Sequence, residues 1–244
     1  MDLIDALSAG VDPCGERGEF HTFAYQGPMF ARPIEVRPGV VVERGGFVFA
    51  DIVPAQPMAA QIVHEPRIGT LELWPLDPAE HVLYRLLAEL FERHWAEITF
   101  GPLIQGAAWE IRATAPPEKL VLFDGYLTVD FATMHFHLCI GEHHGDAGRE
   151  TPPEFAAERR TKRAEFFRRI NTDGTPDTWG LRLINGRGEQ QITVLLPNPF
   201  VTDDHKFRDR PDWSQFGLWD RLRLDHLGLA PDDHDRSGTR MIYP

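Results

Sequence analysis

The stretch from Thr133 to Gly145 reads TMHFHLCIGEHHG, and it indicates how the surrounding chain must fold. Successive side chains of a β-strand point to opposite faces of the sheet. On a strand, Met134, Phe136, Leu138 and Ile140 therefore share one face that is wholly apolar. A register slip of one residue would expose these side chains, at about 1.5–3 kcal/mol of lost burial each. We therefore expect this face to pack on the core.

The opposite face of the strand, and the turn that follows it, are rich in side chains that can bind a metal. The candidate ligands are His135, His137, Cys139, His143 and His144. Imidazole and thiolate groups bind zinc and other divalent transition metals, and Glu142 could act as the base for a metal-bound water. We expect the strand residues to share one polar cleft. The spacing is less specific than a paired C-x-x-C motif, so an ordinary polar strand face stays open as the alternative.

Composition places the chain among ordinary globular proteins. Its 244 residues are 42% hydrophobic and 25% charged, which is enough for a sizeable core. The formal net charge of −12 argues against nucleic acid and anionic membranes as partners. Two cysteines are too few for a disulfide framework. Because no targeting segment or long apolar run is visible, we expect a cytoplasmic protein.

Residues 69–244 are predicted to form one α+β domain with a mainly antiparallel sheet and about three helices. The Pro-rich residues 54–68 are expected to be a linker, and the polar residues 232–235 to lie on the surface. Helical spacing and capping residues predict helices over 77–95, 151–170 and 212–228. Strand-like runs cover 70–74, 106–113, 119–129, 133–140, 179–184 and 189–196. An Asn185-Gly186 turn between two apolar runs predicts a hairpin.

The helix predicted over 151–170 is strongly basic in an otherwise acidic chain. Helical spacing would place Arg160 and Arg163 within an apolar stripe, where guanidinium groups could bind a carboxylate or phosphate of a substrate. The alternative is a solvated face paired with the protein's own acidic residues.

The N-terminal part of the chain carries the most specific motif. Residues 10–23 read GVDPCGERGEFHTF, and GPMF follows at 27–30. This pattern resembles the closing segment of the PP-loop ATP pyrophosphatases of the diphthine–ammonia ligase type, although Gln26 replaces the usual Asp. Residues 39–51 are similar to the last hairpin of that family. The resemblance implies that residues 1–53 are a small β-rich remnant of such a domain. It also implies substrate-side positions at Gly15, Glu16, Gly18, Glu19 and Thr22.

The same family binds ATP through an N-terminal S-G-G-K-D-S loop, and the sequence contains no such loop. We therefore do not expect this chain alone to bind ATP. The resemblance leaves two alternatives, namely a truncated or split amide ligase with a separate PP-loop partner, and a relic that now supplies only strands.

Three functions stay open at this point, and whether the chain is an enzyme stays open with them. The first is a metal-binding protein or metal-dependent enzyme that uses His135, His137 and Cys139. The second is part of an ATP-dependent amide ligase. The third is a non-catalytic domain that binds an unidentified small molecule or acts as a scaffold, with homo-oligomer formation also open.

Overall fold

The computed structural model describes residues 43–44, 47–48, 59–66, 68–104 and 106–241. The fold is α+β with mainly antiparallel sheets, as the sequence predicted. The described elements belong to two compact units. The first contains the short pairs β1 (Glu43–Arg44) with β2 (Phe47–Val48), and β11 (Gly145–Asp146) with β12 (Arg149–Glu150). The second contains all the remaining elements.

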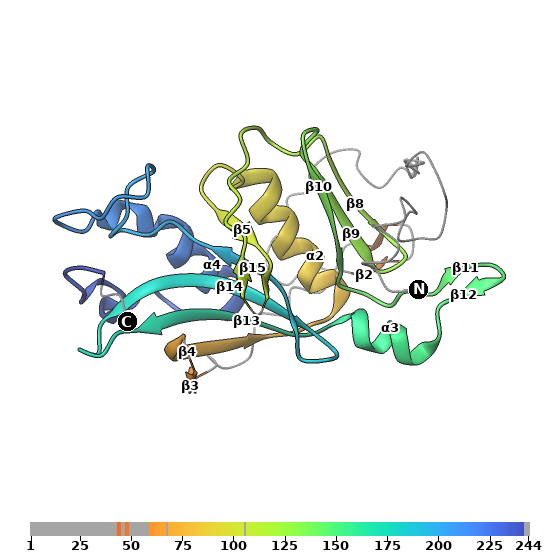
Figure 1. The fold of residues 1–244 in the computed structure, drawn as a ribbon, viewed down its shortest axis with the longest axis horizontal. Coiled ribbons are helices and arrows are strands. Elements are labelled where there is room, and N and C mark those ends of the chain that lie inside the picture. Colours follow the sequence, from red (N-terminus) through yellow and green to blue (C-terminus); the bar gives the residue numbers. More distant parts are fainter. Residues whose placement is uncertain (1–42, 45–46, 49–58, 67, 105, 242–244) are drawn as a thin grey trace. The chain divides into compact units, whose positions relative to one another are not determined.

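The larger unit is built on a six-stranded antiparallel sheet with the order β3-β4-β13-β14-β15-β5 (Figure 1). Its strands are β3 (Gln61–Glu65), β4 (Gly69–Leu76), β13 (Thr161–Ile170), β14 (Pro176–Asn185), β15 (Gln190–Leu195) and β5 (Thr99–Gly101). The two central strands, β13 and β14, have ten residues each, and Asn185 to Gly188 form the turn between β14 and β15. This confirms the hairpin predicted from Asn-Gly.

One face of this sheet carries the main core. A row of cross-strand neighbours runs Trp74, Phe166, Leu181, Val194 and Phe100, and each is at most 3% exposed. Residues in register point to the same side, so this row provides a continuous apolar surface for helices.

On the opposite face, the ring of Phe167 lies over Gly180. A Cβ at Gly180 would come within 2.8 Å of that ring, so the close packing requires glycine there. Glycine at position 180 therefore lets the Phe167 ring pack directly on the backbone, and a larger residue there would displace the ring.

A second sheet has three strands in the order β10-β9-β8, formed by β8 (Lys119–Phe123), β9 (Tyr126–Asp130) and β10 (His135–Cys139). The helix α2 (Glu80–Ala88) lies beside it (Figure 1) and continues as a π-helical turn, η2 (Glu89–Arg93). Leu83, Leu86 and Leu87 of α2 are fully buried in the same core as Leu127 of β9 and Leu181 of β14. The helix therefore joins the two sheets through one hydrophobic core. The short strands β6 (Leu103–Ile104) and β7 (Ala107–Ala108) form a separate pair.

The helix predicted over 151–170 is wrong for most of its length. The structure has α3 (Pro153–Arg159), then extended backbone at Arg160, then strand β13. Strand β13 pairs with β4 through residues 164–170 and with β14 along most of its length, and its aromatic side chains alternate between the two faces. Sheet pairing on both edges outweighs the helical spacing that the sequence suggested. No helical face carrying Arg160 and Arg163 exists.

Three strand predictions also need correction. The run 119–129 is two strands, because Asp124 and Gly125, with φ of 43° and 78°, form a two-residue hairpin turn. In the run 106–113 only Ala107 and Ala108 form a strand, although Ile111 bridges Phe100. The stretch expected to be a linker contains β3, which pairs along β4.

The C-terminal helix α4 (Gly217–Leu227) follows a 3-10 turn, η3 (Trp213–Phe216), and ends at Gly228 with φ of 67°, as predicted. The tail is different from the prediction. Its 3-10 turn η4 (Asp233–Arg236) places Asp235 at 0% exposure. The tail is buried at this point because the carboxylate of Asp235 accepts hydrogen bonds from two arginines and two tryptophans of other elements.

Candidate functional site

Strand β10 has the predicted orientation. Leu138 and Ile140 are buried in the main core, and Met134 and Phe136 pack against it. The apolar face predicted from the sequence is therefore confirmed. On the other face, exposure falls along the strand, from the exposed His135 through the half-buried His137 to the buried Cys139.

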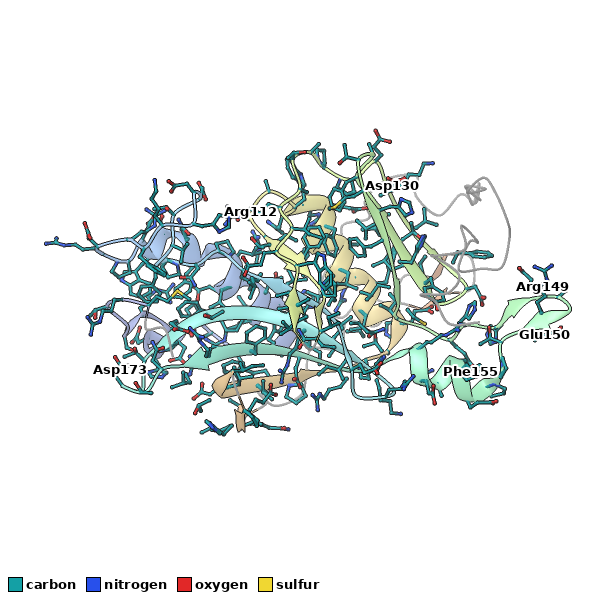
Figure 2. The ribbon with its side chains drawn as sticks, viewed as in Figure 1. Arg112, Asp130, Arg149, Glu150, Phe155 and Asp173 are labelled. Carbon is teal, nitrogen blue, oxygen red and sulfur yellow. The ribbon has the colours of Figure 1, made fainter. Side chains whose placement is uncertain are left out.

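The two histidines lie toward the exposed end of this face. Their ring centroids are 5.3 Å apart in an edge-to-face arrangement. Nδ1 of His137 is 2.8 Å from the hydroxyl oxygen of Thr128 on β9. Asp130 is in register with His135, and Figure 2 shows it at this end of the sheet. The histidines thus form part of a polar, hydrogen-bonded strand surface.

Cys139 is enclosed by partners at the other end of the strand. Its thiol hydrogen-bonds with the Tyr126 hydroxyl and lies 3.6 Å from the carbonyl oxygen of Gly141. Burial raises the pKa of the Cys139 thiol to about 11, although the tyrosine and Arg159 oppose the shift. Burial also raises the pKa of the Tyr126 hydroxyl. The raised pKa lowers the fraction of reactive thiolate at neutral pH.

His143 lies in the segment after β10, next to the Asp124-Gly125 hairpin turn, and not on the strand face. Its side chain is 4% exposed, and its Nδ1 lies 2.7 Å from a carboxylate oxygen of Asp124. The other carboxylate oxygen of Asp124 accepts a hydrogen bond from the backbone of His144. Gly125 packs closely on the same loop, since a Cβ there would lie 2.6 Å from the carbonyl oxygen of Glu142. The Asp124-Gly125 turn thus holds the segment from Gly141 to His144 in place.

The predicted metal ligands are spread over these separate settings. Within the described residues, no three side chains of His, Cys, Asp or Glu are grouped so that they could hold a metal ion. Metal binding by these residues stays a prediction. The positions Gly15, Glu16, Gly18, Glu19 and Thr22 lie outside the described residues, so the predicted substrate side of a PP-loop domain stays a prediction too.

A cavity of about 550 Å³ opens where three junctions of the larger unit meet. They are the start of α2, the end of β10 and the passage from α3 to β13, which lie close together in Figure 1. The lining residues are Pro78, Ala79, Glu80, Ile140, Gly141, Glu142, Arg160, Thr161 and Lys162. Residues far apart in the sequence therefore line one cavity. Two of the predicted site residues, Glu142 and Arg160, are among them.

Four of the lining side chains are charged, two of each sign. In the part of the chain that the structure describes, Glu80, Glu142, Arg160 and Lys162 have no opposite charge within 4.0 Å. The carboxylate of Glu80 lies against Gly141, in space that a Cβ would fill. The cavity therefore presents both kinds of charge without using them in internal ion pairs.

Sequence reasoning found only part of this site. Arg163 was expected beside Arg160 on one helical face. Its Nε instead lies 3.3 Å from a carboxylate oxygen of Glu165, and it is not part of the cavity lining. Glu80 and Lys162 were not singled out as site residues. The sequence gives no signal for Glu80 as a site residue, because its contact with Gly141 depends on the tertiary structure.

Phe155 is 46% exposed on α3 (Figure 2), and no described element covers it. Among the described residues, no helix has the length and apolar character needed to cross a membrane.

The model of the Family of unknown function (DUF7676) matches residues 60–228, which is more than half of the chain. The matched region contains every residue that lines the cavity. A search of curated proteins finds no match to the chain.

Proposed function

We propose that this chain, which belongs to the Family of unknown function (DUF7676), binds a charged small molecule in the cavity between α2, β10 and β13. A volume of about 550 Å³ lies within the range of sites that bind small molecules, roughly 300–1,000 Å³. This is the third of the functions that the sequence left open, now tied to a specific site.

The observation that supports the proposal is the set of four unpaired charges around one cavity. Elsewhere in the larger unit, buried charges are neutralised by close partners, as in the pair of Arg182 with Glu165 at 2.6 Å. Where Glu80, Glu142, Arg160 and Lys162 face the cavity, the described residues supply no such partner. Charged groups that converge on a concave site without internal partners are suited to bind a ligand.

The other functions predicted from the sequence remain proposals of lower rank. A metal-dependent reaction at the His135/His137/Cys139 strand remains a proposal from the sequence, and Cys139 lies at the buried end of that strand, away from the exposed His135. A separate PP-loop partner, homo-oligomer formation and a cytoplasmic location rest on the sequence alone.

The proposal can be tested by ligand-observed NMR with a library of charged metabolites. We expect ligands that bind the native protein but lose at least tenfold in affinity in the double variant Arg160→Gln/Lys162→Gln. The matched control is Lys119→Gln/Arg210→Gln, which removes the same charge from exposed side chains outside the cavity. Absence of any hit, or equal loss in both double variants, would overturn the proposal.

A further inference from the structure

We infer that the cavity takes a zwitterionic amino carboxylate, an amino acid or short peptide that carries one anionic and one ammonium group. This inference rests on the binding site proposed above and specifies its ligand. Arg160 and Lys162 would bind the carboxylate, and Glu80 and Glu142 would bind the ammonium group.

The balance of charge in the cavity favours a ligand with both charges over a ligand with only one. A purely anionic ligand would gain from Arg160 and Lys162 but would place its charge beside Glu80 and Glu142. A purely cationic ligand would gain from the two carboxylates but would place its charge beside Arg160 and Lys162, and like charges at close range repel. Only a molecule with both charges makes favourable contacts with all four side chains.

The chemistry of each pair of side chains supports this division. A guanidinium presents a planar set of donors that matches a carboxylate, whereas lysine adds a point charge. The Thr161 hydroxyl lies 2.8 Å from Oε1 of Gln191 and 3.1 Å from the carbonyl oxygen of Cys139, so its hydrogen is already used within the protein. Recognition of the carboxylate therefore falls on the two cations.

The walls of the cavity are held in place by one side chain of β15. The amide nitrogen of Gln191 donates to the carbonyl oxygen of Cys139 at 3.1 Å and to that of Arg159 at 3.0 Å. These two residues directly precede the wall segments that begin at Ile140 and Arg160. The charged groups from β10 and from the α3–β13 passage therefore stand on backbone that is already fixed, which lowers the cost of ordering them around a ligand.

The charge of the whole chain also favours a zwitterion. With a formal net charge of −12, the protein repels small anions at long range. A zwitterion has no net charge and approaches without this penalty. The remaining volume of the cavity, beyond the two charged ends of the ligand, has room for a side chain or a second residue.

The test compares ligands of equal length by isothermal titration calorimetry with the full chain. The probes are glycine, γ-aminobutyrate, ε-aminocaproate and glycylglycine, each with its amide and its deaminated carboxylate. We expect at least one zwitterion to bind tenfold or more tightly than both of its single-charge analogues. If a single-charge analogue binds as tightly, or if only other metabolites bind in the NMR screen, the zwitterion inference is overturned while the binding site stands.

Variants then assign each end of the ligand. We expect Arg160→Gln to reduce the affinity for the zwitterion to that of its amide, which keeps the ammonium group but lacks the carboxylate. Glu142→Gln should reduce it to that of the carboxylate, and because Glu142 is exposed this change leaves the fold intact. The control is Lys119→Gln. Equal affinity of all three variants would place the zwitterion elsewhere and overturn the inference.

Discussion

Two groups of charged residues in the larger unit are arranged in opposite ways. Around Asp235, which is 0% exposed, every carboxylate oxygen is used. Asp235 accepts hydrogen bonds from Arg168 at 2.7 Å, Arg223 at 2.9 Å, and the indoles of Trp179 at 2.9 Å and Trp219 at 2.8 Å. The charge is neutralised inside the protein, and the cluster joins the tail to the central sheet.

The charges around the cavity have the reverse arrangement. Glu80, Glu142, Arg160 and Lys162 lie at the surface or half-buried, and no opposite charge of the described residues lies within 4.0 Å of them. The comparison shows how one chain separates two uses of charge. Paired and buried groups hold the fold, and unpaired groups around a concave surface remain available to a ligand.

The largest effect on stability is expected when Asp235, the buried acid of the internal cluster, is replaced. Asp235→Ala leaves the buried guanidiniums of Arg168 and Arg223 without their shared partner. Removing one member of a buried ion pair typically costs about 3–5 kcal/mol of unfolding free energy. Urea denaturation measures the loss, with Asp233→Ala, an exposed residue of the same turn, as the control. A loss below about 1 kcal/mol would mean that the cluster does not hold the tail.

The next prediction concerns Cys139, which lies beside the cavity but is satisfied internally. Its pKa of about 11, against an ordinary 9.0, lowers the thiolate fraction at pH 8 by about a hundredfold. In a Cys14→Ser background, iodoacetamide should therefore modify the native protein at least that much more slowly than the same protein in denaturant. Rates within tenfold of each other would show an accessible, reactive thiol and would move Cys139 into the group of available residues.

A third prediction tests the ion pair of Glu65 with Arg182. It is paired like the Asp235 cluster, but Glu65 is partly exposed like the charges around the cavity. Hydrogen bonds from Arg182, at 2.6 and 3.0 Å, hold the pKa of Glu65 below its usual 4.5. A lowered pKa in the folded state gives stability above pH 4.5 that is lost as the pH falls through the folded-state pKa. Glu65→Gln should cost about 1–2 kcal/mol at pH 7, allowing for screening by solvent.

The pH dependence separates this ion pair from a general charge effect. The stability gap between native protein and Glu65→Gln should close in acid, as measured by urea unfolding from pH 7 down to pH 3. Glu110→Gln, at an exposed position, is the control. A gap that stays constant over this range would contradict the assigned role of the carboxylate.

The smallest effect is expected in the cavity. Because Arg160 and Lys162 make no ion pair with described residues, neutralising either one should change the unfolding free energy by less than about 0.5 kcal/mol without ligand. Thermal unfolding of Arg160→Gln and Lys162→Gln measures this. A loss above about 1.5 kcal/mol would show that these charges also hold the fold, and the contrast with Asp235 would fail.

The pattern of the sequence was sufficient where local chemistry and burial agree. The apolar face of β10 and the hairpin after Asn185 were predicted because each depends on side chains close in sequence. The turn at Asp124-Gly125 carried an equally strong signal, and the surrounding apolar run concealed it. The segment 161–170 was predicted as a helix because its basic and apolar residues also match helical spacing, and only pairing with β4 and β14 made it a strand.

By itself, the sequence determined the fold class and which side of β10 faces the core, because both follow from the periodicity of apolar residues. Only the tertiary structure decided which charges have partners. Asp235, in a tail that looks solvent-exposed in sequence, is buried because two arginines and two tryptophans from other elements meet it. Glu80 and Arg160 share a cavity because three element junctions converge, and contacts across such distances in the chain leave no periodic trace in the sequence.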